Sequence, residues 1–437
     1  MLRIATIVWL WAVGTTIGFA ADPPKTFRAG AAKSDITPPA GLPMWGYAAR
    51  HDAPAVGVLD PLQARALVIE VGGEKLAIVA TDLGRGPTPA MLAEIQRELL
   101  AKAKIRRVLV CGSHTHHGPV LELTDTPSRG QGKYDSAIAY SRKLPGLIVE
   151  TVLKADRDLR PAKIGTSSQA VAFNQNRQAK KRPKVTDPNL VVLRLDDMAG
   201  KPIALLVNYA AHPTMTDAKL LKYSADYVGH LRTKVENEFD APCLFLQGAS
   251  GDLSTSTPPG VTHGPKGFGE SLGVIVVALA KAIDTQVPAS PSLSSDETVT
   301  RFSTRIDLKN PLVQTMYGRA FFPELIACAG DEHGEGVDAR LSTVVLNGEV
   351  ALVGVSGEFF CEHANRLRSR LDLKTTLFLG YCNGHHFYFP TIEAAAEGGY
   401  GAEPGVSLAE LGAGERLMDQ ALLSIARMLG RFPAERR

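Results

Sequence analysis

Three histidines stand within four positions of one another: His114, His116 and His117. They directly follow VLVCG at residues 108–112, an apolar run that predicts a buried strand ending at a glycine. Side chains two apart in a strand point to the same face, so His114 and His116 can converge on one pocket. A His-x-His pair at a strand end is typical of half a zinc site. The alternative is a polar strand end with solvated histidines, but the clustering favours a metal.

Polar segments follow four other apolar runs of the chain. These segments are AHPT at 211–214, GASGDLS at 248–254, SGE at 356–358 and CNGHHFY at 382–388. In open α/β sheets the ligand crevice lies beyond the carboxyl ends of strands, so we expect these segments to meet there. Each segment alone is weak evidence for a site. His212 could be a histidine of the core, and Glu358 could be a carboxylate near the start of a helix. Together they predict a hydrolytic zinc site that keeps one position open for water.

The elements that must position these residues alternate between strands and helices. Gly72-Gly73 and Asn347-Gly348 each separate two apolar runs and predict hairpins. A strand is predicted at 297–308, and helices at 89–103, 137–155 (with Pro145 as a candidate break), 227–239, 269–283, 360–371 and 408–428. This mixture predicts an α/β fold, a mixed β-sheet core flanked by helices with the metal site at the C-terminal ends of strands.

Composition places the chain among soluble globular proteins. It has 437 residues, 45% hydrophobic and 21% charged, and we expect one large catalytic domain over residues 27–430. A net charge of +3 gives no argument for nucleic acid as a partner. The five cysteines are an odd number and contain no CxxC pair, which argues against a cysteine zinc site.

Residues 1–21 have the pattern of a signal peptide. Arg3 supplies a positive start, residues 4–19 are nearly all apolar, and small residues at 18–21 offer a cleavage site. An uncleaved anchor is the alternative, but the apolar run is short for a membrane span. We therefore expect a secreted or periplasmic protein with no stable membrane span after cleavage.

A series of short motifs runs through the chain in a fixed order. They are GAAKSDITPP at 30–39, GY at 46–47, SHTHHGP at 113–119, NQNR at 174–177, NYAAHPT at 208–214, SGDLS at 250–254, SGEF at 356–359, GYCN at 380–383, and Tyr388 with Tyr400 twelve residues later. In these motifs and their order the sequence resembles the neutral/alkaline (non-lysosomal) ceramidases over most of residues 28–425. The resemblance stops before the C-terminal immunoglobulin-like domain of longer members, so we expect a short form.

The resemblance implies a role for each motif residue. The implied zinc ligands, for one Zn²⁺ per chain, are His114, His212, Glu358 and Tyr388. The implied catalytic groups around the scissile amide are His116, Arg177, Ser254 and Tyr400. The context of Ser254 does not fit a Gly-x-Ser-x-Gly nucleophile elbow, so an orienting or oxyanion role is preferred to a nucleophilic one.

The expected activity is that of a zinc-dependent amidohydrolase, which cleaves the N-acyl amide of ceramide into a sphingoid base and a fatty acid. Departures from the family pattern at Thr255 and His385 lie close to the site, and they favour the alternative of a zinc hydrolase for another small amide or ester. A metallo-β-lactamase-type dinuclear site is disfavoured, because the aspartate–histidine half of its motif is missing. A non-catalytic exported metal-binding protein of the same fold is a further alternative. The retained Arg177, Ser254 and Tyr400 argue against it.

Overall fold

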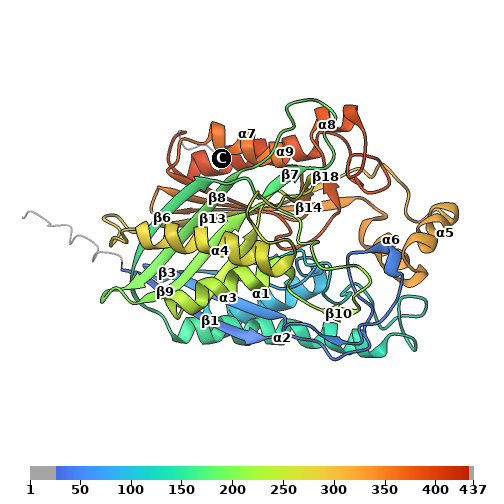
Figure 1. Cartoon of the computed structure of the whole chain (residues 1–437), viewed down its shortest axis with the longest axis horizontal. Coiled ribbons are helices and arrows are strands. Elements are labelled where there is room, and N and C mark those ends of the chain that lie inside the picture. The colour runs from blue at the N-terminus through green and yellow to red at the C-terminus, as the bar shows by residue number, and fades with distance from the viewer. Residues whose placement is uncertain (1–25, 433–437) are drawn as a thin grey trace, which may run out of the picture.

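The computed structural model describes residues 26–432, which build two stacked β-sheets with helices on their outer faces (Figure 1). The larger sheet has eight strands, parallel at its two ends and antiparallel between. In spatial order they are β11 (Cys243–Gln247), β9 (Pro202–Tyr209), β8 (Asn189–Asp197), β6 (Arg160–Ala170), β1 (Phe27–Asp35), β3 (Gln63–Val71), β4 (Glu74–Thr81) and β5 (Arg107–Gly112).

The smaller sheet has four strands and packs face to face on the larger one. In order they are β13 (Leu293–Phe302), β14 (Val337–Leu346), β15 (Val350–Val355) and β17 (Thr375–Leu379). Side chains alternate along each strand, so Leu67 of β3 enters the layer between the sheets and Val68 faces the helices. Leu352 and Leu377 of the smaller sheet complete the layer with Leu67.

Three helix pairs cover the outer faces of the sheets. α1 (Pro89–Ala103) and α2 (Asp135–Arg157) pack on one half of the larger sheet, and α3 (Asp226–Phe239) and α4 (Pro265–Ala282) pack on the other half. α7 (Cys361–Arg370) and α9 (Ala413–Met428) cover the smaller sheet along the upper edge of Figure 1. The layers therefore run helix, sheet, sheet, helix.

Short elements gather at one end of the sheets. α5 (Pro311–Ala320) and α6 (Pro323–His333) form an arm at the right of Figure 1. The small strand pairs and short helices are β2 (Gly57–Val58) with β10 (Lys222–Tyr223), β7 (Asn174–Asn176) with β12 (Leu253–Thr255), β16 (Glu358–Phe359) with β18 (Tyr388–Phe389), the 3₁₀ turn Ala48–Arg50, and α8 (Ile392–Glu397).

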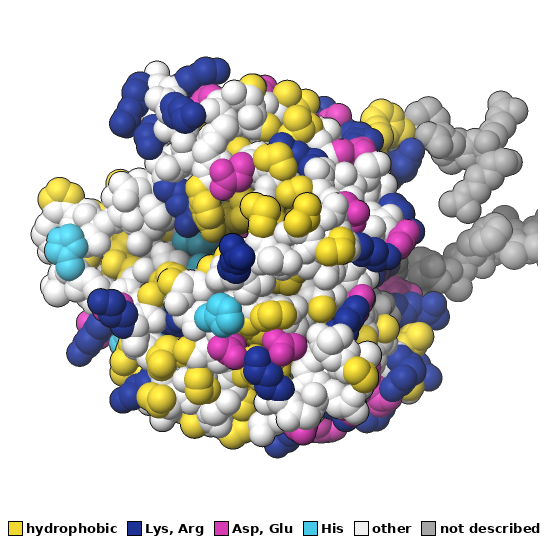
Figure 2. Space-filling model, turned by 90° about the vertical axis from the view of Figure 1, so that its right-hand side faces the viewer, with side chains coloured by type: hydrophobic (Ala, Val, Ile, Leu, Met, Phe, Trp, Pro, Cys, Tyr) yellow, Lys and Arg dark blue, Asp and Glu magenta, His cyan; other side chains and the backbone are white. Residues whose placement is uncertain are grey.

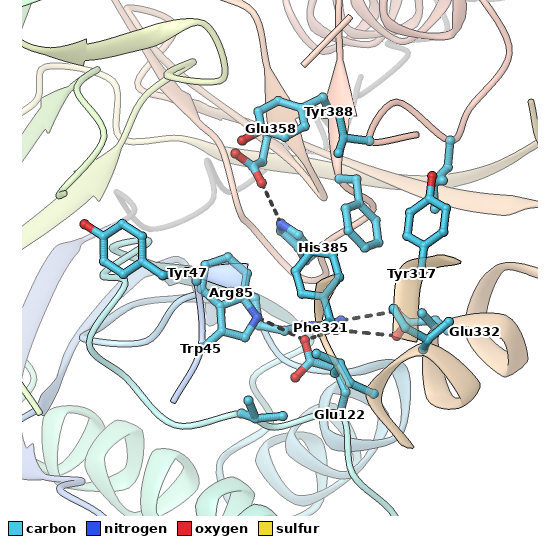
Figure 3. Close-up of a pocket in the computed structure, with 18 of the residues that line it drawn as sticks. Trp45, Tyr47, Arg85, Glu122, Tyr317, Phe321, Glu332, Glu358, His385 and Tyr388 are labelled. Atoms are coloured by element: carbon cyan, nitrogen blue, oxygen red, sulfur yellow. Dashed lines mark hydrogen bonds and ion pairs between the residues drawn. The ribbon is translucent and has the colours of Figure 1, made fainter. Parts of the chain in front are cut away.

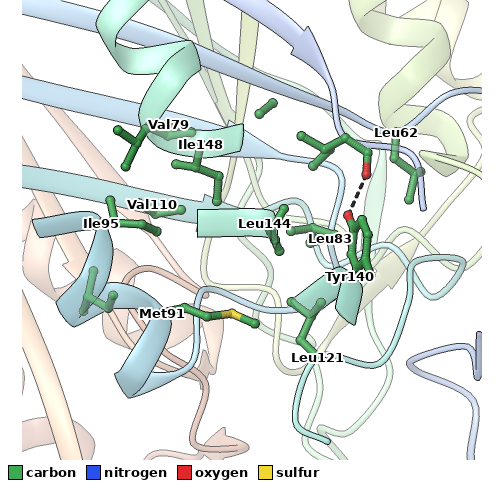
Figure 4. Packing of buried hydrophobic residues seen from close by; sticks show 14 of the residues in the cluster. Leu62, Val79, Leu83, Met91, Ile95, Val110, Leu121, Tyr140, Leu144 and Ile148 are labelled. Atoms are coloured by element: carbon green, nitrogen blue, oxygen red, sulfur yellow. Dashed lines mark hydrogen bonds between the residues drawn. The ribbon is translucent and has the colours of Figure 1, made fainter. Parts of the chain in front are cut away.

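The packing of α1 shows how β5 is held in place. Thr88 caps the helix by accepting a hydrogen bond from the backbone N–H of Met91. Met91 and Ile95 lie four residues apart, one helical turn, so both face the sheet and join a cluster with Val79 and Val110 (Figure 4). Val110 belongs to β5, so the strand that leads to His114 is anchored by this core.

Two buried asparagines tie the sheets together at the end where the polar segments gather. The side chain of Asn208 donates to the carbonyl of Phe378 (2.8 Å) and accepts from its N–H (3.1 Å). The Asn383 side chain accepts from the N–H of Val110 (2.8 Å) and donates to the carbonyl of Val108 (2.8 Å). In each case the side-chain amide pairs with backbone N–H and C=O groups that a neighbouring strand would otherwise bind. The strand ends of both sheets are thereby fixed relative to one another.

The predicted fold class and both hairpins are confirmed. The stacking of two separate sheets was not predicted. The helix α2 runs through Pro145 without a break, because buried residues on both sides hold it against the core despite the lost hydrogen bond. The strand predicted at 297–308 ends at Phe302, where the chain leaves the sheet for the α5–α6 arm.

The remaining predictions concern the chain ends and the thiols. The predicted signal peptide lies outside the described residues, so export stays a prediction, as do the domain boundaries 27–430. Among the described helices, none combines the length and apolar character needed to cross a bilayer. All five cysteines lie within the described residues, and each is a free, buried thiol.

Candidate active site

His114, His212 and Glu358 converge at the carboxyl ends of the strands. His114 follows β5, His212 follows β9, and Glu358 begins β16. The Nε2 atoms of the two histidines are 2.9 Å apart, and the Oε2 atom of Glu358 lies 3.2 and 3.3 Å from them. All three side chains are buried. Ligands around a tetrahedral zinc lie about 3.4 Å apart for bonds of ~2.1 Å, so the spacing is close to that of a zinc site.

Backbone carbonyls fix the orientation of both imidazoles. The Nδ1 atom of His114 lies 2.8 Å from the carbonyl oxygen of Gly84, and that of His212 lies 2.7 Å from the carbonyl of Ser250. With Nδ1 as the donor, each Nε2 presents its lone pair to the other ring and to the carboxylate. Burial lowers the pKa of His212 to about 3, so this ring is neutral at pH 7.

Three acceptor atoms that face one another need a proton or a metal cation between them. Burial opposes ionisation of Glu358, but the neighbouring histidines outweigh it and hold the pKa of its carboxyl well below its usual range. Two lone pairs and one carboxylate oxygen therefore form a donor set that fits zinc, and the carbonyls behind the rings supply the usual outer support.

The other residues of the predicted ligand and catalytic set lie beside this cluster, with the exception of Ser254. The Nε2 atom of His116 is 3.4 Å from that of His114. Tyr388 pairs with Glu358 in the parallel register of β16 and β18, and its hydroxyl lies 3.4 Å from the hydroxyl of Tyr400. The position of Tyr388 next to Glu358 is visible in Figure 3.

Arg177 reaches into the cluster from the end of β7. Its Nη2 atom lies 2.9 Å from the carbonyl of Gly251, 3.1 Å from Nε2 of His212 and 3.2 Å from the hydroxyl of Tyr388. Its guanidinium also stands 5.3 Å from the centre of the Tyr400 ring. The side chain is thus directed away from the basic run that follows it in sequence.

Ser254 is placed differently from the other predicted residues. Within the described part of the chain its hydroxyl reaches only the carbonyl of Gln175, at 3.5 Å. The strand that carries it lies beside His212, whose N–H donates to the carbonyl of Leu253 (3.1 Å). The backbone at Ser254 therefore supports the His212 segment, while its hydroxyl is not brought to the metal cluster.

Three further groups contact the cluster that sequence reasoning did not include among the ligands or catalytic residues, although it placed His385 close to the site. The Nε2 atom of His385 lies 3.1 Å from Oε1 of Glu358, the carboxylate oxygen on the side away from His114 and His212. The Tyr381 hydroxyl lies 3.4 Å from Oε2 of Glu358 and 3.0 Å from Oγ of Ser250. All three residues belong to segments that follow apolar runs, and this position was the available signal.

A glycine next to the cluster has no room for a side chain. A methyl group on Gly251 would lie 2.5 Å from the carbonyl oxygen of Glu358. We expect Gly251→Ala to shift the Glu358 strand, lower stability by about 1–3 kcal/mol and weaken zinc binding. The control is Gly57→Ala, because a methyl group there meets nothing within 4 Å. Denaturation midpoints and zinc titration check the pair, and equal behaviour of both variants contradicts the tight packing.

A pocket opens over the cluster and is mostly apolar. Figure 2 looks at this end of the molecule, where hydrophobic side chains line a recess in which histidine is visible. Trp45 and Phe387 lie near the cluster, and the arm of α5 and α6 supplies the outer wall. The aromatic and branched residues of that wall include Tyr317, Phe321, Phe322, Leu325 and Ile326.

The pocket floor also carries a buried charge network (Figure 3). Arg85 lies 3.1 Å from both Glu122 and Glu332. Trp45 donates its indole N–H to Glu122 at 3.1 Å. The pocket thus combines an apolar wall with a polar floor, and the histidine cluster lies at its inner end.

Comparison with known proteins identifies the family of the chain. A model of the N-terminal part of the neutral/alkaline non-lysosomal ceramidases matches residues 27–254. Neutral ceramidase B of Dictyostelium discoideum is 24% identical over 268 residues, and neutral ceramidase A of the same organism is 26% identical over 269. Each match covers 53% of this chain and 36% of the relative, so only about a third of these curated relatives is spanned.

Two solved structures share the fold over 94% of this chain and 76% of their own. Neutral ceramidase from Pseudomonas aeruginosa superposes with a TM-score of 0.73 at 20% identity. A ceramidase described as complexed with C2 gives a TM-score of 0.72 at 19% identity. These likenesses establish the shared architecture.

Proposed function

Because the chain belongs to the neutral/alkaline non-lysosomal ceramidase family, we propose that it is a zinc-dependent hydrolase of an N-acyl amide of the ceramide class. One observation carries the proposal: two oriented imidazole lone pairs and a carboxylate meet at the inner end of an apolar pocket. This places a cation-binding donor set where the carbonyl of a lipid amide could reach it.

The metal would be held by His114, His212 and Glu358, with Tyr388 as the fourth ligand. A zinc ion there would polarise the amide carbonyl and lower the pKa of water to about 7, which supplies hydroxide at neutral pH. Burial raises the pKa of Tyr388 well above its usual value, so in the absence of a metal this residue is a neutral phenol. Tyr388 would therefore be the weakest of the four ligands.

The neighbouring side chains would handle charge and protons. Arg177 and Tyr400 would donate hydrogen bonds to the oxygen that becomes negative when the amide carbonyl is attacked. His116 is neutral at pH 7, because burial holds its pKa well below its usual value. It would accept a proton at a ring nitrogen and pass it to the leaving amine. Ser254 would act as an orienting residue through the strand that supports His212.

The pocket wall supplies the basis for a lipid substrate. Aromatic and aliphatic side chains of the α5–α6 arm line the space above the cluster, as an alkyl chain requires. Each buried methylene contributes about 0.8 kcal/mol, roughly a fourfold gain in binding. We therefore expect kcat/KM to rise with acyl length from N-acetyl to long-chain N-acylsphingosines, until the pocket is filled.

The measurement compares N-acyl amides of increasing length on purified, zinc-loaded protein, with chelator-treated protein as the control. If the protein hydrolyses a short amide or ester but not long-chain ceramide, it shares the chemistry of the family but not its substrate. A zinc-loaded protein that turns over no amide or ester would instead be a metal-binding protein of this fold.

A further inference from the structure

A second group of ligand-type residues lies beside the pocket, apart from the cluster already described. It consists of Glu332 and His333 at the end of α6 and His386 in the segment between β17 and β18. One ligand atom from each residue lies within 4.8 Å of the others. His333 is 2% exposed and His386 is 5% exposed, so both rings are inside the protein.

One ring nitrogen of each imidazole lacks a hydrogen-bond partner within residues 26–432. The Nδ1 atoms of His333 and His386 are fully buried with nothing to donate to or accept from. The two rings stand edge to face with their centres 5.1 Å apart, so they are close without being bonded. A buried ring nitrogen without a partner is costly, and native proteins rarely leave two side by side.

The surrounding charge favours a cation at this place. Among residues 26–432, Arg85 is the one Lys or Arg side chain that forms an ion pair with Glu332, and it is shared with Glu122. Two carboxylates against one guanidinium leave this buried network with one net negative charge.

We propose that Glu332, His333 and His386 bind a second zinc ion. Two imidazole nitrogens and one carboxylate oxygen suit zinc, whereas magnesium and calcium prefer oxygen ligands alone. The ion would give both orphaned rings a partner and reverse the net charge of the network. The carboxylate of Glu332 would be shared between the ion and Arg85.

The proposed second zinc site, called the clamp below, would hold the pocket wall in place. Glu332 and His333 belong to the helix that forms the wall, and His386 follows His385, which contacts Glu358. A zinc ion between them would join the wall to the segment behind the catalytic cluster. The zinc content would then be two ions per chain, one more than the sequence predicts, and the second ion takes no part in hydrolysis.

The test is a zinc count on the full chain. Protein stripped with a chelator is loaded with zinc chloride alone, desalted and analysed for zinc per chain. We expect two ions in the wild type, one in His333→Gln and one in His386→Gln. The matched control is His363→Gln, which removes a buried histidine whose Nε2 atom also lacks a partner but has no such ligand group around it. It should keep two.

The count separates this proposal from the proposed function. His114→Ala should lose only the catalytic ion and keep the second one. If His114→Ala keeps all its zinc while His386→Gln loses one, the clamp stands and the catalytic assignment fails. A wild type with one ion, absent from His114→Ala and retained by His333→Gln, overturns the clamp and leaves water as the partner of the two rings.

A second readout does not depend on replacing a ligand of the clamp. In His114→Ala protein, which lacks the catalytic ion, zinc should slow hydrogen exchange in α6, because the clamp fixes the end of that helix. Unchanged exchange over residues 323–333 on addition of zinc contradicts the proposal, even if a histidine variant fails to fold.

Discussion

Alanine in place of His114 is expected to abolish zinc retention at the catalytic cluster and to lower kcat/KM by at least about 10³-fold. The Nε2 atom of His114 is 2.9 Å from that of His212 and 3.2 Å from the Glu358 carboxylate, so it completes the donor set. Without it, one imidazole, one carboxylate and the weakly binding hydroxyl of Tyr388 would remain, too few to hold zinc in competition with water. The polarising charge on the amide carbonyl is lost together with the ion.

The measurements are the zinc content and the steady-state rate on an N-acyl amide. His263→Ala is the control, because this histidine is exposed and lies outside the cluster. Circular dichroism and a melting curve establish that the variant is folded. A folded His114→Ala protein with an unchanged zinc count and rate would show that the cluster does not hold the catalytic metal.

Alanine in place of Arg177 is expected to reduce kcat by about 10²–10³-fold and to leave the zinc content unchanged. The guanidinium is held by the Gly251 carbonyl and the Tyr388 hydroxyl, beside the place where negative charge develops. Lysine should restore only part of the rate, since a single ammonium cannot match the planar fork of arginine.

Arg182→Ala provides the matched control for Arg177→Ala. Both arginines belong to the same stretch of sequence, but Arg182 is exposed. Its loss should leave kcat and KM unchanged. If both variants have wild-type kinetics, Arg177 is a surface cation that happens to lie against the site.

The sequence predicts that the candidate metal ligands converge, because the relevant signal is local. His114, His212 and Glu358 each follow an apolar run, and strand ends of a sheet meet at one edge. The fold class follows from the same alternation of runs. A local sequence pattern does not show which strands belong to the same sheet. The two stacked sheets are therefore seen only in the structure, where strands distant in sequence pair.

Other features are decided by contacts far apart in sequence. Because a basic run follows Arg177, its sequence is as compatible with a surface position as with a position in the site. Only the contacts with Gly251 and Tyr388 show that Arg177 lies in the site. The α5–α6 arm was missed because α5 has no buried side chain and therefore little apolar periodicity. The contact of His385 with Glu358 is likewise tertiary, and the family pattern placed His385 close to the site without giving it this partner.

The five buried thiols can report the order in which parts of this chain unfold. Cys111 and Cys382 lie between the two sheets, and Cys243 lies beneath α3 and α4. Burial raises the pKa of Cys243 to about 12, so a thiol reagent can attack it at an appreciable rate only after the surrounding layer opens. The order in which a thiol reagent labels these cysteines would therefore report the order in which the layers separate. No probe needs to be introduced into the chain.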